Sequence, residues 1–200
     1  MQYRSIPVVW FSLIVLYGCG AQSQAPVQSD SQNSQANDVS PTLPPSGEQG
    51  SNNSSSDCTY DAIDIDMLAA VNSARAASRM CGTQNLPAVP ALTLNCKLTK
   101  AAQLHSEDMA THRVMSHTGS DGSSMTSRIS AQNYSYSSAA ENVAYGYADV
   151  DAVMTGWLES PGHCANIMRN SVVHLGVGFA IARQNQRDEP YWTQNFAKPR

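Results

Sequence analysis

The stretch that decides the fold is residues 174–181, HLGVGFAI, together with residues 191–197, YWTQNFA. In both, apolar side chains alternate with small or polar ones, which is the period of two typical of a half-buried β-strand. Residues 183–190 between them are polar and end in Pro190, as expected of a hairpin connection. We therefore expect two antiparallel strands, paired with each other, near the end of the chain.

Upstream of this strand pair the sequence predicts helices. Residues 61–75 repeat Ile, Leu, Val and Ala at intervals of three and four, with acidic residues in the first turn, and the pattern stops near Cys81-Gly82. A second helix is expected over residues 96–114. A third is expected over residues 149–159, ended by Ser160-Pro161-Gly162.

The segments between these helices are predicted to be loops and one short strand. Residues 87–90 contain two prolines, and residues 116–136 are rich in Ser and Gly, with room for a short helix at 125–129. Residues 143–145 read as a strand that follows Glu141-Asn142. Helices first and paired strands last indicate an α+β domain with helices packed on a small antiparallel sheet.

The N-terminal segment predicts export. Residues 6–17 are almost entirely apolar, too short for a membrane-spanning helix but suited to a signal-peptide core. Leu16-Tyr17-Gly18-Cys19 resembles a bacterial lipobox, so residues 1–19 are expected to be a signal peptide and Cys19 a lipidated N-terminus. The alternative is an ordinary secretory signal, cleaved around Gly20 or Ala21.

The next segment, residues 20–56, consists mainly of Ser, Gln, Asn and Pro and has no Lys or Arg. Without apolar periodicity it cannot repay the entropy of ordering, so we expect a disordered tether. The folded domain is therefore assigned to residues 57–200.

Charge and motifs exclude several function classes. The net charge is −4, only 14% of residues are charged and no basic run is present, so nucleic acid is not an expected partner. The serine-hydrolase elbow, the phosphate-binding glycine loop and the H-E-x-x-H zinc motif are all absent from the sequence.

Three residues are candidates for a site: His117 in Met115-Ser-His-Thr-Gly119, Glu141 beside Asn142, and His163 in Ser160-Pro-Gly-His-Cys164. Imidazole and carboxylate groups that converge suit zinc or another divalent ion. Any single exposed histidine is more often a hydrogen-bonded structural residue.

Several short motifs in a fixed order carry a family resemblance. They are MLAAVNSAR (67–75), AAQLHSEDMA (101–110), SHTG (116–119) with Asp121-Gly122, AENVA (140–144), GWLESPGHCANIM (156–168), LGVGF (175–179) and YWTQNFA (191–197). Together they cover nearly all of residues 62–197 and resemble the CAP superfamily of cysteine-rich secretory proteins, antigen 5 allergens and plant pathogenesis-related proteins, in its compact bacterial form.

This resemblance implies a three-layer α-β-α sandwich with a cleft lined by two His and two Glu. By motif, three of these four are His117, Glu141 and His163. In the family, the residues of this cleft can hold a divalent ion such as zinc. The fourth position departs from the pattern, because Ser160 stands where the family has Glu and Glu159 comes one residue early. A shift of one residue turns a helical side chain by about 100°, so Glu159 is a doubtful fourth member.

Other residues have a structural interpretation beside the functional one. On its helix face His105 is expected to make a structural hydrogen bond, Trp157 and Trp192 to lie in the core, and Arg128 to position the loop. If Cys19 carries lipid, four cysteines remain, and these allow three connectivities. We favour Cys81–Cys164 with Cys58–Cys96.

For function the sequence supports three hypotheses. The favoured one is a non-enzymatic binding module, membrane-anchored through Cys19 in the cell envelope, or secreted if the lipobox is not used. Its cleft would take a small ligand, a lipid or a protein. The alternatives are a metal-dependent hydrolase or peptidase with Glu141 as general base, and a lipid or sterol carrier.

Overall fold

The computed structural model describes residues 58–184 and 187–200. The predicted signal peptide with Cys19 (1–19) and the predicted tether (20–56) lie outside these residues. The described elements are α1 (Ala62–Arg75), β1 (Arg79–Cys81), β2 (Gln84–Leu86), β3 (Thr93–Leu94), α2 (Cys96–His112), α3 (Met125–Ala131), β4 (Tyr136–Tyr145), α4 (Val150–Glu159), α5 (Pro161–Ile167), β5 (His174–Gln184) and β6 (Arg187–Pro199).

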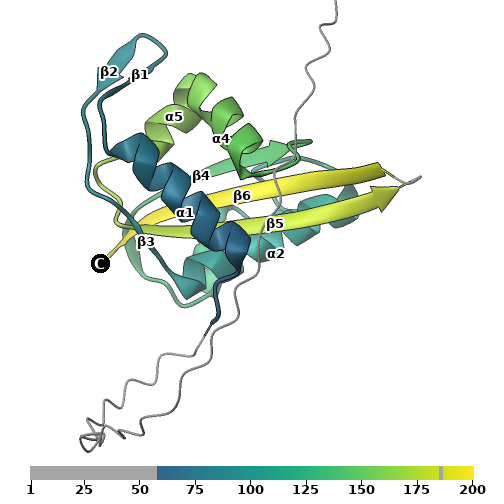
Figure 1. Ribbon diagram of the computed structural model, residues 1–200. Helices are drawn as coiled ribbons and strands as arrows, with labels where there is room; N and C mark the ends of the chain where they lie inside the picture. The colour runs from purple at the N-terminus through teal and green to yellow at the C-terminus, as the bar shows by residue number, and fades with distance from the viewer. Residues whose placement is uncertain (1–57, 185–186) are drawn as a thin grey trace, which may run out of the picture. The chain divides into compact units, whose positions relative to one another are not determined.

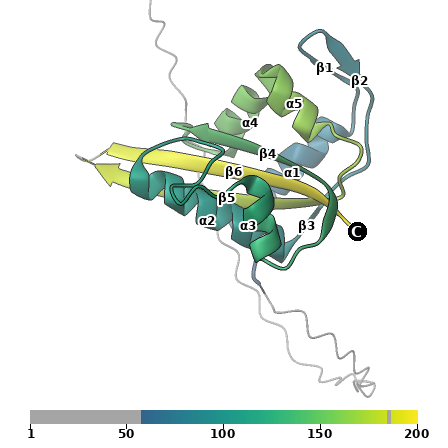
Figure 2. The ribbon, with the colours of Figure 1, turned by 180° about the vertical axis from the view of Figure 1, so that it is seen from behind.

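A four-stranded sheet in the order β3-β5-β6-β4 forms the middle layer. The helices α1, α4 and α5 cover one face, whereas α2 and α3 cover the other (Figures 1 and 2). This arrangement confirms the predicted three-layer α-β-α sandwich. The two long strands β5 and β6 pair antiparallel, as the alternation at 174–181 and 191–197 predicted.

The sheet differs from the prediction at one edge. The two-residue strand β3 pairs parallel to β5, with Thr93 opposite His174, so the sheet is mixed rather than purely antiparallel. Two residues are too few to produce an alternating pattern, which is why the sequence predicted no strand there.

The main core lies between the sheet and the layer of α1, α4 and α5. Met67 and Val71 of α1, Trp157 of α4, and Leu175 and Trp192 of the sheet are all essentially buried. The predicted core positions of Trp157 and Trp192 are thus confirmed.

On the opposite face α2 lies very close to β5. A β-carbon added at Gly176 would meet the backbone of Leu98 and Thr99, and one at Gly178 would meet the backbone of Ala102. Any larger residue at either position would therefore push helix and sheet apart.

Capping residues fix where the first two helices begin. The side chain of Asp61 accepts from the amide of Asp64 and the Asp64 carboxylate accepts from the amide of Asp61, forming a capping box at α1. Asn95 caps α2 through the amides of Lys97 and Leu98. At its other end α2 stops at Arg113, whose left-handed φ of 55° turns the chain into the loop that carries His117.

Two predicted boundaries were wrong. The first helix ends at Arg75 rather than near Cys81-Gly82, and residues 79–86 form the β1–β2 hairpin instead. Pro161, expected to lie beyond a helix end, begins α5, because proline is well suited to the first helical turn, where no amide donor is required.

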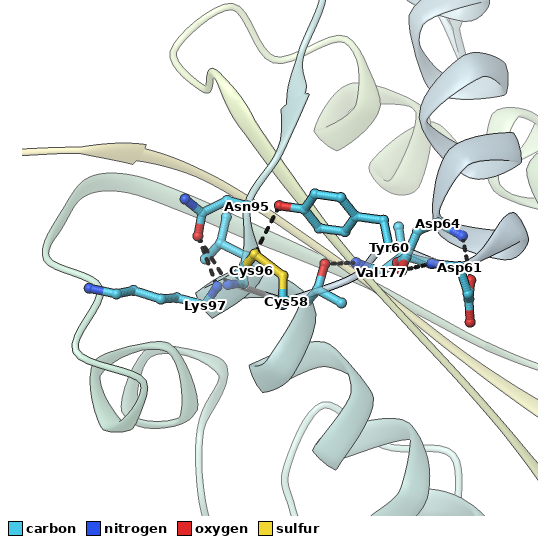
Figure 3. Close-up of a disulfide and its surroundings, with 10 residues drawn as sticks. Cys58, Tyr60, Asp61, Asp64, Asn95, Cys96, Lys97 and Val177 are labelled. Carbon is cyan, nitrogen blue, oxygen red and sulfur yellow. Dashed lines mark hydrogen bonds between the residues drawn. A yellow bond between two sulfur atoms is a disulfide. The ribbon is translucent and has the colours of Figure 1, made fainter. Parts of the chain in front are cut away.

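The cysteines pair as Cys58–Cys96 and Cys81–Cys164, which is the connectivity favoured from the sequence. The first bridge joins the segment before α1 to the start of α2, and the Tyr60 hydroxyl donates to the Cys96 sulfur over 3.2 Å (Figure 3). The second bridge is buried and fastens the β1–β2 hairpin to α5, one residue after His163.

A buried arginine fixes the far end of α5. Arg75, at the end of α1, is fully buried and donates through Nη1 to the carbonyls of Ile167 and Arg169, over 2.6 and 3.0 Å. Its Nε donates to the carbonyl of Pro90 over 2.8 Å. The short helix that carries His163 is therefore held in its middle by a disulfide and at its end by this arginine.

The strand β4 lies at an edge of the sheet, and two of its carbonyls accept hydrogen bonds from side chains of neighbouring helices. The Trp157 indole donates to the Val143 carbonyl over 3.2 Å, and the Asn166 amide donates to the Glu141 carbonyl over the same distance. Both donors come from the helices α4 and α5 beside this edge. Within the described residues, no helix is long and apolar enough to cross a membrane.

Candidate functional site

The loop after α2 presents His117 and is fixed by two side chains. His105 donates through Nε2 to the carbonyl of Ser116 over 2.8 Å, which is the structural hydrogen bond predicted for it. Arg128 donates through Nη2 to the carbonyl of His117 over 3.1 Å. The carbonyls of Ser116 and His117 are thus both hydrogen-bonded, while the His117 side chain remains 59% exposed.

Glu141 lies on β4 opposite Asn195 and is almost completely buried, with 3% of its side chain exposed. Its Oε1 accepts from His117 Nδ1 over 2.9 Å, and its Oε2 accepts from Arg128 Nη2 over 2.7 Å. Asn195, with its side-chain oxygen accepting from the Ala102 amide, donates to Oε2 over 3.2 Å and is the third donor to this carboxylate. Both carboxylate oxygens therefore already have donors, including one permanent cation.

Arg128, on α3, connects this carboxylate to the surrounding loop. Besides Glu141 and the His117 carbonyl, its guanidinium donates to the Ser123 carbonyl over 2.9 Å. Its side chain is only 10% exposed. The expected role of Arg128 in positioning the loop is confirmed by these bonds.

His163 lies in the first turn of α5, on the other side of β4. Its carbonyl accepts from Asn142 Nδ2 over 3.3 Å, and Asn166 Nδ2 donates to the Asn142 oxygen over 2.9 Å. Burial lowers the pKa of His163, and the nearby imidazole of His117 lowers it further. Both effects disfavour the protonated ring of His163.

The residues predicted from the sequence thus divide into two groups. His117 and Glu141 are in direct contact, and His163 is near enough to His117 to feel its charge. Glu159 is exposed and makes no hydrogen bond or ion pair within the described residues. No group of three or more His, Cys, Asp or Glu in the described part of the chain is arranged to hold a metal ion.

The geometry fixes the tautomer of His117 and hence its available chemistry. A carboxylate only accepts hydrogen bonds, so Nδ1 of His117 carries the proton and, in the neutral ring, Nε2 keeps its lone pair. That nitrogen lies on an exposed side chain. The arrangement can present two imidazoles to a cation or a ligand, with Glu141 orienting one of them.

A layer of buried polar side chains behind this site carried no signal that predicted it from the sequence. Asn142, Gln194 and Asn195 are fully buried, and the Asn142 amide also donates to the Gln194 oxygen over 3.1 Å. The spacing His163-x-x-Asn166 can be read directly from the sequence, and in a helix it places both residues on one face. The partners of Asn142 and Asn195 on other elements carried no such local signal.

Comparisons with curated proteins match parts of two longer Bacillus subtilis (strain 168) chains. The uncharacterized membrane protein YlbC is 37% identical over 94 residues, which is 47% of this chain and 25% of YlbC. The uncharacterized protein YkwD is 30% identical over 105 residues, or 52% of this chain and 38% of YkwD. The chain thus spans well under half the length of either relative.

Two solved structures are among those to which this chain is similar. An extracellular protein containing an SCP domain from Bacillus anthracis str. Ames is 28% identical, with a TM-score of 0.48, over 55% of this chain and 34% of that one. Venom allergen-like protein 4 of Schistosoma mansoni is 13% identical, with a TM-score of 0.50, over 70% of this chain and 91% of that one.

The family model for CAP, described as the cysteine-rich secretory protein family, matches residues 68–196. This range begins in α1, ends in β6 and includes His117, Glu141 and His163. With that match and the three-layer fold, the chain belongs to the cysteine-rich secretory protein (CAP) family.

Proposed function

We propose that this protein is an exported CAP-domain binding module whose cleft holds a divalent ion such as zinc between the imidazoles of His117 and His163. The ion and the surrounding polar groups would then take a small ligand, a lipid or a protein segment. The observation that carries this proposal is the engagement of both Glu141 oxygens, which leaves the imidazoles as the available donors.

The donor set fits such an ion. Zinc accepts imidazole nitrogen readily, and ligating histidines commonly donate their other ring N–H to a carboxylate. The His117–Glu141 hydrogen bond has this form. With only two protein donors, an ion would keep coordination positions free for a ligand, which suits a binding role.

The hydrolase alternative requires Glu141 to act as a general base. A general base must receive a proton from a water in contact with it, but Glu141 is buried and its two oxygens already accept hydrogen bonds from His117 and Arg128. The same contacts that suit an orienting role therefore oppose that catalytic role. Cleavage of a peptide library, abolished by His163→Ala, would support the hydrolase instead.

The carrier alternative requires a hollow with apolar side chains in its wall. A hollow of about 730 Å³ lies between α1 and the start of α4, with Phe179 and Trp192 among its lining residues. Tight sterol or fatty-acid binding that is indifferent to His117→Ala and His163→Ala would favour this function.

For location, the proposal is a lipid anchor on Cys19 that holds the domain at the cell envelope, outside the cytoplasm, or secretion if the lipobox is not used. The apolar segment 6–17 supports export, and two disulfides are what an oxidising compartment permits. Labelling with radioactive palmitate should mark the wild-type chain but not Cys19→Ser. An unlabelled wild-type chain would overturn the anchor.

The metal proposal is tested by zinc titration calorimetry on the full chain. His117→Ala and His163→Ala should each abolish saturable zinc binding. His112→Ala is the matched control, because His112 is a similarly exposed histidine on the last turn of α2 that pairs with Asp108 instead. Binding that survives both site variants, or that falls equally in the control, would remove the metal from the proposal.

A further inference from the structure

The hollow of about 730 Å³ between α1 and the start of α4 has an apolar floor. Both helices cover the same face of the sheet (Figure 1). The larger apolar residues that line the hollow are Ile63, Val150, Phe179 and Trp192. Trp192 is only 1% exposed and its ring lies 4.3 Å, between centroids, from that of Phe179. None of the three residues of the His117 cleft lines this hollow, so the two are separate.

Three carboxylates line the same hollow, and no opposite charge balances them. They belong to Asp66 on α1 and to Asp149 and Asp151 at the start of α4, all at exposed positions. Within the described residues none of the three forms an ion pair, and no Lys, Arg or His lines the hollow. One Asp149 oxygen accepts from the Ala152 amide over 2.8 Å as the cap of α4, and this neutral donor leaves the charge in place. The hollow is therefore an apolar surface bordered by three uncompensated negative charges.

The hollow is open along α1. Asp66, Ala69 and Ser73 line it at intervals of three and four residues, which places them in one row on the helix, and all three are exposed. The short side chains of Ala69 and Ser73 leave this side of α1 accessible. A small molecule would keep much of its surface in water here, whereas small-molecule sites usually enclose their ligand. A segment of polypeptide can instead lie along an open groove and bury one apolar face in it.

Charge selects the kind of segment. The three carboxylates repel an acidic segment, and they repel the carboxylate of a fatty acid for the same reason. They attract Lys and Arg side chains, whose cationic groups are also attracted to aromatic rings such as that of Phe179. The apolar floor in turn favours a segment that carries apolar side chains on one face.

From this complementarity we propose that the hollow between α1 and α4 is the docking site for a basic amphipathic segment of a partner protein. Its apolar side chains would cover Val150 and Phe179, and its Lys or Arg side chains would pair with Asp66, Asp149 and Asp151. This proposal requires no metal ion and is independent of the function proposed for the His117 cleft.

The test is an NMR titration of the full chain, labelled with ¹⁵N-tryptophan, in a zwitterionic detergent at low salt. The probes are a 12-residue peptide of lysine and leucine with one apolar face, the same peptide with glutamate for lysine, and the same peptide with serine for leucine. The basic amphipathic peptide should shift the indole N–H of Trp192 in a saturable way. The indole N–H of Trp157, which is buried and does not line the hollow, is the internal control and should not shift.

The other two peptides test the two components of the proposal. The acidic peptide should not bind, and the serine peptide should bind more weakly than the leucine peptide. Raising the ionic strength to about 1 M, where the Debye length is about 3 Å, should weaken binding of the basic peptide. No saturable shift with the basic amphipathic peptide, or an equal shift with the acidic one, would overturn the proposal.

Charge variants test the carboxylates. Asp66→Asn should weaken binding by up to about fivefold, and the triple variant with Asp149→Asn and Asp151→Asn by about tenfold or more. Asparagine caps a helix about as well as aspartate, so the triple variant keeps the start of α4. Asp121→Asn, exposed and outside this hollow, is the control and should bind normally. Unchanged binding in the triple variant would refute the pairing.

A steric variant tests the location. Ala69→Trp places a large side chain in the hollow at an exposed position and should abolish binding, whereas Ala62→Trp, exposed on the same helix but not among the lining residues, should not. Binding that persists in Ala69→Trp would place the peptide elsewhere. Tighter binding of oleate or cholesterol than of the basic peptide would assign the hollow to a lipid and overturn the proposal.

Discussion

The ion pair between Arg128 and Glu141 is predicted to be a major contributor to stability, and Arg128→Ala tests this. The pair is 2.7 Å long, and its side chains are 10% and 3% exposed, so little water can replace the lost guanidinium. Removing one partner of a buried pair costs about 3–5 kcal/mol, because the remaining charge is left uncompensated. The variant also loses donors to the His117 and Ser123 carbonyls, so its cost should lie in this range.

Urea denaturation followed by tryptophan fluorescence measures this cost. With a denaturant slope of about 2 kcal/mol/M, a loss of 3–5 kcal/mol lowers the midpoint by roughly 1.5–2.5 M. Arg183→Ala is the control, because its 3.5 Å pair with Asp188 is 82% and 60% exposed. Exposed pairs contribute less than about 1 kcal/mol, so the control should barely move.

A double-mutant cycle separates the ion pair from the loop contacts. Glu141→Gln keeps the shape of the side chain but removes the charge, and the double variant Arg128→Ala with Glu141→Gln should be more stable than the two single costs predict. A coupling energy of about 1.5–3 kcal/mol is expected for groups in direct contact. Strict additivity, or a cost below about 1 kcal/mol for Arg128→Ala, would refute the reasoning.

Three further predictions concern pH, redox conditions and packing. Burial lowers the pKa of His105, His163 and His174 below the ordinary value of 6.5, so the unfolded chain binds protons that the folded protein does not. The free energy of unfolding should therefore fall as the pH drops below about 6.5, and urea midpoints that rise on acidification would contradict this. Cys58 is exposed whereas Cys81 and Cys164 are buried, so mild reduction with alkylation and mass spectrometry should label Cys58 and Cys96 first. Gly176→Ala should cost about 1–3 kcal/mol or more, because its β-carbon meets helix backbone, while Gly162→Ala in α5, with open space around it, should be neutral or stabilise by up to ~1 kcal/mol.

Elements with strong local signals were predictable from the sequence. The apolar period of α1 located the start of that helix but not its end, and the alternation at 174–181 and 191–197 located the central parts of β5 and β6. The helix α5 was not predicted, because Ser160-Pro161-Gly162 reads locally as a helix stop. Proline also suits a first helical turn, and the contacts of Cys164 and Arg75 with distant residues hold α5 in place.

The candidate site was predictable in part. Family motifs pointed to His117 and Glu141, which the structure brings into contact. The ion pair of Arg128 with Glu141 joins residues 13 apart on different elements, and no spacing rule connects a helix residue to that strand position. Long-range polar partners of this kind arise from the way the layers meet, and a single sequence does not encode them locally.

The contacts along the outer edge of β4 have a consequence for self-association. An open edge strand offers its carbonyls as a template on which a neighbouring chain can extend the sheet. Here Trp157 and Asn166 occupy two of those carbonyls in the middle of the strand. These two carbonyls are therefore not free to pair with a neighbouring strand, and Asn166→Ala should raise the tendency to aggregate even where the fold survives.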